Sequence, residues 1–102
     1  MDDALRQDLI GAVAQLAPEW RVVIHREGGS YRVRQEQERK FLGTFKRAPQ
    51  QLPVVDLSQE GNGWSGQIHL GTNKEMETAI KQVFLAHGQD LRISRFHPAP
   101  SR

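Results

Sequence analysis

The residues of this chain that could do chemistry are mostly basic, and they concentrate between residues 21 and 47. That stretch holds eight Lys or Arg residues against three acids, Glu27, Glu36 and Glu38. Arginine binds phosphate through paired hydrogen bonds, and cations gathered on one surface attract the nucleic-acid backbone. The candidate nucleic-acid-binding residues are Arg21, His25, Arg32, Arg34, Arg39, Lys40, Lys46 and Arg47.

Catalytic and metal-binding chemistry has little support in the sequence. The four histidines fall in four different predicted elements, and no pair has the spacing of zinc ligands: His25, His69, His87 and His97. No serine lies in a nucleophile-elbow pattern. The chain has no cysteine, which excludes a disulfide framework, a thiolate zinc site and a cysteine nucleophile. We therefore predict a non-enzymatic protein without a metal or a cofactor.

A weaker alternative is a small ribonuclease that needs no metal. Arginine, histidine and tyrosine together can cleave RNA by acid–base catalysis and charge stabilisation. His25, Tyr31, Arg32 and Arg34 lie on one predicted hairpin. Strand alternation places Tyr31 opposite the arginines, which disfavours this alternative.

Hydrophobic periodicity predicts two helices and five or six strands that position these side chains. Apolar residues three or four positions apart, as at Leu5, Leu9 and Val13, are typical of an amphipathic helix. Alternation of apolar and polar residues is typical of a strand. We expect one helix over 3–16, another between a cap at Thr72 or Asn73 and Gly88, and strands at 20–26, 30–36, 41–45, 53–58, 64–70 and 91–96.

Turn and cap residues separate these elements. Gly28-Gly29 and Gly61-Asn62-Gly63 predict two tight hairpin turns. Thr72 and Glu75 have the spacing of a capping box, which favours Thr72 over Asn73 as the cap of the second helix.

The order of the elements predicts an α+β fold, with the sequence α-β-β-β-β-β-α-β. Consecutive hairpins imply a mostly antiparallel sheet, and two amphipathic helices pack on one face of it. The result is a two-layer sandwich with five to six strands and one open sheet face. A chain of 102 residues forms one domain, here 1–96, followed by a flexible tail over 97–102.

The order of helix, strands and helix is similar to that of the double-stranded-RNA-binding domain. The second helix of that family opens with a basic patch, whereas this chain has Thr72-Asn73-Lys74-Glu75-Met76-Glu77 at that place. The acidic residues are wrong for contact with phosphate, and the chain has an extra hairpin and an extra strand. We assign no family from the sequence.

Strand alternation places four of the candidate residues on the open sheet face: Arg21, His25, Arg32 and Arg34. Arg39, Lys40, Lys46 and Arg47 could extend this basic strip. The sequence therefore predicts a small binding module that contacts nucleic-acid phosphates, with the choice between DNA and RNA left open. The aromatic residues Trp20, Tyr31 and Trp64 are expected on the core side, which removes them as a platform for stacked bases.

Two alternatives stay open. An exposed sheet face must carry polar residues in any case, so the strip could serve only solubility. The chain could also be a protein-binding accessory factor, such as an adaptor, inhibitor or chaperone, and could form a homodimer. That function needs an unpaired strand edge or an exposed apolar patch, for which Phe41, Leu42, Leu52 and Val54 are candidates.

Apolar runs such as Val22-Val23-Ile24 are too short to cross a bilayer, and the start of the chain lacks the pattern of a signal peptide. We expect no membrane partner and a cytoplasmic location, and the absence of cysteine fits a reducing compartment.

Overall fold

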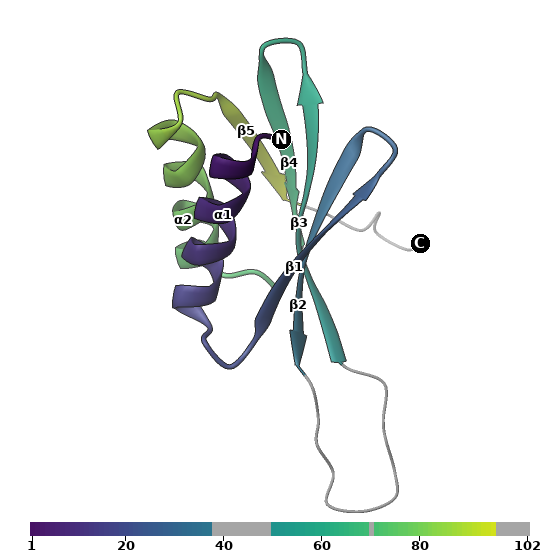
Figure 1. The fold of residues 1–102 in the computed structure, drawn as a ribbon, viewed down its shortest axis with the longest axis vertical. Helices are drawn as coiled ribbons and strands as arrows, with labels where there is room; N and C mark the ends of the chain where they lie inside the picture. Colours follow the sequence, from purple (N-terminus) through teal and green to yellow (C-terminus); the bar gives the residue numbers. More distant parts are fainter. Residues whose placement is uncertain (38–49, 70, 96–102) are drawn as a thin grey trace, which may run out of the picture.

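A computed structural model describes residues 1–37, 50–69 and 71–95 of the chain (Figure 1). The described part has an α+β fold, as predicted, in which two helices and five strands follow the order α-β-β-β-β-α-β. The elements are α1 (Asp3–Leu16), β1 (Arg21–Glu27), β2 (Ser30–Gln37), β3 (Gln50–Glu60), β4 (Gly63–Ile68), α2 (Lys74–Ala86) and β5 (Leu91–Arg95). The strand expected at 41–45 and the tail at 97–102 lie outside the described residues.

The five strands form one sheet in the order β1-β2-β3-β4-β5. The first four strands pair antiparallel as consecutive hairpins. Strand β5 pairs parallel with β4, because α2 connects them as a crossover. The sheet is therefore mostly antiparallel, and β1 and β5 are its edges.

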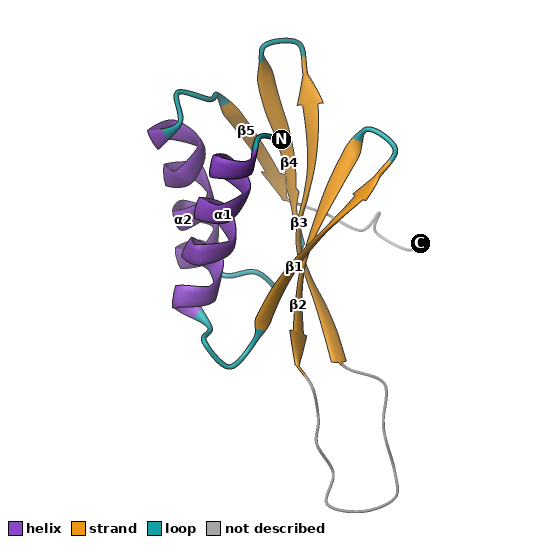
Figure 2. Cartoon of the chain, in the orientation of Figure 1, coloured by secondary structure: helices purple, strands orange, loops and turns teal. Residues whose placement is uncertain are grey.

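Both helices pack on one face of the sheet (Figures 1 and 2). Leu9 on α1 and Phe84 on α2 are fully buried, together with Val33 and Leu57 on the sheet. The ring of Trp64 lies between Tyr31 and Phe84, with centroids 5.8 and 5.7 Å away. This aromatic group joins the helix layer to the centre of the sheet.

The caps of α2 correct one prediction. Asn73, not Thr72, is the N-cap, and its side-chain oxygen accepts a hydrogen bond from the backbone N–H of Met76. The hydroxyl of Thr72 instead donates to the carbonyl of Val54, which ties the start of the helix to β3. At the other end, Gly88 adopts a φ of 67°, in the left-handed region that closes many helices.

Strand β3 begins earlier than predicted, at Gln50, and contains a bulge. The register shifts between Val33 and Arg34, so that Val54 has no partner of its own on β2. The bulge turns both Val54 and Val55 into the core, where each is at most 1% exposed. Pro53 stands beside it, where the missing N–H of proline is tolerated. The bulge explains why Pro53 does not end the strand.

Candidate nucleic-acid interface

The predicted basic residues on β1 and β2 lie on the face of the sheet away from the helices. In the pairing of β1 with β2, His25 is opposite Arg32, while the neighbouring pair Ile24 and Val33 faces the core. Arg21 and Arg34 lie on the same side of the sheet as His25. Arg39, Lys40, Lys46 and Arg47 fall outside the described residues. We call the side of the sheet that carries Arg21, His25, Arg32, Arg34, Ser58, Ser65 and Arg92 the open face.

Acidic residues pair with three of these arginines. Arg21 contacts Glu36 at 2.7 Å and Arg32 contacts Glu27 at 3.1 Å. Hydrogen bonds from Arg21 and Gln51 lower the pKa of Glu36 below its usual value. Both side chains of the Arg32–Glu27 pair are exposed, at 48% and 58%, and such an ion pair contributes about 0–1 kcal/mol and opens readily. Glu36 is only 12% exposed, so its pair with Arg21 is partly shielded from water.

The third ion pair belongs to a half-buried cluster around Asp56. One carboxylate oxygen accepts from Nη1 of Arg34 at 3.1 Å, and the other accepts from Nε2 of His69 at 3.0 Å. Burial alone would raise the pKa of Asp56, but the hydrogen bonds from His69 and Arg34 outweigh it and hold the pKa below its ordinary value. Arg34 is only 16% exposed and also donates to the carbonyl of Val33. These contacts tie β2 to β3.

Replacing Asp56 with asparagine should lower the free energy of unfolding by about 1 kcal/mol at pH 7, since solvent screens this partly exposed cluster. The folded pKa of Asp56 is depressed. Its stabilisation is therefore present above the unfolded value of about 3.9 and is lost as the pH falls through the folded pKa. The free energies of unfolding of Asp56→Asn and of the unaltered protein, measured in urea, should differ above pH 5, and the difference should shrink progressively as the pH falls below 4. The exposed control Glu60→Gln should show no such difference, and a constant gap for Asp56→Asn down to pH 3 would contradict the assignment.

A row of hydroxyl groups that the sequence pattern did not predict crosses the open face beside the arginines. Ser30 pairs with Ser58, Ser58 with Ser65, and Ser65 with Arg92, so the row runs from β2 to β5. The hydroxyls of Ser30 and Ser58 are 3.2 Å apart. Measured across the strands, Arg32 and Arg92 are three strand spacings apart, or about 14 Å, and the register places Arg32 level with Ser94, two residues along β5 from Arg92.

Arg92 is the basic residue that the candidate set should have included. It is exposed, and no acidic side chain within the described ranges forms an ion pair with it. The signal was present in the sequence, because residues 91–102 carry three arginines and no acid. What the sequence could not supply was the parallel pairing of β5, which brings Arg92 beside β4.

The remaining predictions for this surface concern aromatic and apolar side chains. Tyr31 and Trp64 pack on the core side, as expected, so neither ring lies on the open face. Of the apolar patch proposed for a protein partner, Leu52 is exposed but Val54 is buried, which contradicts that part of the prediction. The bulge in β3 is the reason. Phe41 and Leu42 lie outside the described residues.

Within the described ranges, no group of three His, Asp or Glu residues is placed to hold a metal ion. Neither α1 nor α2, the helices of the described part, has the length and apolar character needed to cross a membrane. Compared with protein-family models, curated proteins and solved structures, the chain gives no match.

Proposed function

We propose that this protein is a small binding module whose open face holds the phosphate backbone of a nucleic acid. The observation that carries the proposal is the row of serine hydroxyls with an exposed arginine toward each end, Arg32 on β2 and Arg92 on β5. Arginine and serine are among the side chains that contact phosphate and sugar without reading sequence. Serine side chains are short, so they leave a flat floor between the two cations.

The ion pairs decide which cations are available to a phosphate. Arg34 is paired with Asp56 in the half-buried cluster, whereas both side chains of the Arg32–Glu27 pair are exposed. A phosphate can replace Glu27 at small cost, because an exposed ion pair contributes little. Arg92 needs no such exchange. Arg32 and Arg92 are therefore the residues expected to bind.

The distribution of charge between the layers favours this orientation. Residues 1–20, which include α1, carry four acids and one arginine. A polyanion is repelled by that side of the molecule and attracted to the open face. With no aromatic platform, binding should depend on charge rather than on base identity, and therefore strongly on salt.

Fluorescence anisotropy with labelled single- and double-stranded oligonucleotides at two salt concentrations tests the proposal. The double variant Arg32→Ala/Arg92→Ala should weaken binding at least tenfold and reduce the salt slope by about 1 to 2, since each phosphate contact contributes about one unit of slope. The control Arg6→Ala/Lys81→Ala removes the same charge from the helix layer and should change affinity little.

Two results would contradict the proposal. One is the absence of binding by either oligonucleotide at low salt, a result that would favour a protein partner instead. The other is an equal loss of affinity in both double variants, because overall charge rather than the open face would then control binding.

A further inference from the structure

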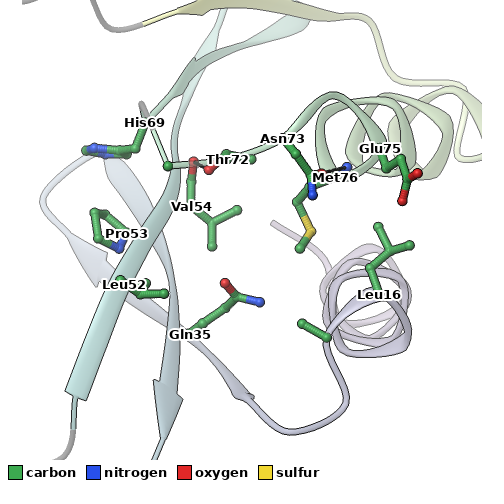
Figure 3. A pocket seen from close by; sticks show the side chains of 12 residues that line it. Leu16, Gln35, Leu52, Pro53, Val54, His69, Thr72, Asn73, Glu75 and Met76 are labelled. Atoms are coloured by element: carbon green, nitrogen blue, oxygen red, sulfur yellow. Dashed lines mark hydrogen bonds between the residues drawn. The ribbon is translucent and has the colours of Figure 1, made fainter.

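A cavity of about 440 Å³ lies on the opposite side of the sheet from the open face. It is enclosed by the last turn of α1, the start of α2 and the adjoining parts of β2 and β3 (Figure 3). Much of its wall is apolar and comes from Leu16, Leu52, Val54 and Met76. Its volume falls in the range of small-molecule sites, which are about 300–1,000 Å³.

One polar side chain points into this apolar space. Gln35 follows Tyr31 and Val33 on the core side of β2 and is 8% exposed. Figure 3 shows its amide directed into the space between Leu52, Leu16 and Met76. Its Nε2 is buried and has no hydrogen-bond partner among the residues that the structure describes. A buried donor without an acceptor costs about 1–3 kcal/mol, so the position is expensive unless an acceptor arrives from outside.

Three other side-chain atoms around the cavity are already engaged. The hydroxyl of Thr72 donates to Val54, and the side-chain oxygen of Asn73 caps α2. His69 points away from the cavity in Figure 3 and is bound to Asp56. Among the described residues of the wall, Gln35 Nε2 is thus the buried side-chain donor that has no partner.

The charges of the wall indicate a neutral molecule. Among the described residues that line the cavity there is no Lys or Arg, and the one acid is Glu75, exposed at the rim. An anion would lose its hydration without meeting a counter-charge from these residues and would also face Glu75. A cation would find no buried carboxylate among them.

We propose that this cavity binds a small neutral molecule with an apolar body and a carbonyl group. The carbonyl oxygen accepts from Nε2 of Gln35, and the body packs among Leu16, Leu52 and Met76. Because Nε2 is covered, a side chain has to move to admit the carbonyl. Met76 has the flexibility for this, and Leu16 is 43% exposed at the end of α1. The site is separate from the open face, so either proposal can fail without the other.

The test compares three probes of similar size by NMR titration of the full chain, labelled with 15N and with 13C in its methionine methyl groups. Acetophenone has the carbonyl, ethylbenzene replaces it with CH₂, and benzoate carries a charge. Acetophenone should bind several-fold more tightly than ethylbenzene and at least tenfold more tightly than benzoate. It should shift the side-chain amide signals of Gln35 and the methyl signal of Met76.

The variant Gln35→Leu should lose the preference for acetophenone over ethylbenzene and should melt at a higher temperature, because an apolar side chain replaces the unpaired amide. Gln35→Met gives a second, more flexible version of the same test should leucine not fit. The control Gln67→Leu, on the other side of the sheet, should keep the preference. Failure of all probes to bind, equal binding of acetophenone and ethylbenzene, a preference for benzoate, or a preference that survives in Gln35→Leu would each overturn the proposal.

Discussion

Replacing Phe84 with alanine should lower the free energy of unfolding by about 3–5 kcal/mol. Phe84 is fully buried on α2, and the edge of its ring meets Trp64 at the centre of the sheet. A domain of this size is typically stabilised by about 5–15 kcal/mol, so the variant loses a large part of the total. Removing the ring also opens a cavity between the two layers, which adds to the lost burial.

The neighbouring residue provides the control for this prediction. Leu85 is 75% exposed on the same helix, so Leu85→Ala should change stability by less than about 0.5 kcal/mol. Urea unfolding followed by circular dichroism measures both variants. A loss of under 1 kcal/mol for Phe84→Ala would show that α2 does not pack on the sheet through this side chain.

The periodicity of the sequence was sufficient to predict the architecture. The spacing of Leu5, Leu9 and Val13 predicted α1 with its bounds, and Gly28-Gly29 predicted the turn between β1 and β2. Such signals are local, because a helix face or a two-residue turn is encoded within a few positions. The side of the sheet on which the arginines lie followed from the same alternation.

The errors arose where a tertiary contact decided between two local possibilities. Thr72 and Asn73 are both good caps, and Thr72 was excluded by its hydrogen bond to Val54, a residue 18 positions earlier. Because of the bulge, the side chain of Val54 does not follow simple strand alternation and points into the core. Val54 is therefore buried, although it was expected in an exposed patch. Neither effect can be recognised before the strands are paired.

The candidate site was predicted less completely than the fold. The arginines of the first hairpin were identified by their charge, but the acidic partner of Arg34 was not, because Asp56 and Arg34 meet only through the pairing of β2 with β3. Serines carry no charge, so nothing in the sequence marked Ser58 and Ser65 as neighbours on one row. Burial of the Gln35 amide likewise depends on how the helices close over the sheet.

Replacing Gly66 with valine should lower the free energy of unfolding by about 2–3 kcal/mol, even though valine favours strands. Gly66 lies on β4 facing the core, and an added Cβ would stand 3.3 Å from methyl carbons of Leu57 and Leu91 and 3.4 Å from one of Val55. Alanine should cost less than about 1 kcal/mol, because the ends of two leucine side chains can yield by a few tenths of an ångström. The two further methyl groups of valine would have to displace these side chains of β3 and β5.

Ser65 tests whether packing or strand propensity controls this effect. It is the residue before Gly66 on β4 and lies on the open face, so Ser65→Val gains the propensity of valine without entering the core. In thermal unfolding, the melting temperature of Ser65→Val should equal or slightly exceed that of the unaltered protein. The melting temperature of Gly66→Ala should be slightly lower than that of the unaltered protein, and that of Gly66→Val much lower. Equal stability of the two valine variants would mean that the side chains of Leu57, Leu91 and Val55 leave room for a larger residue at position 66, and the tight packing around Gly66 would then be wrong.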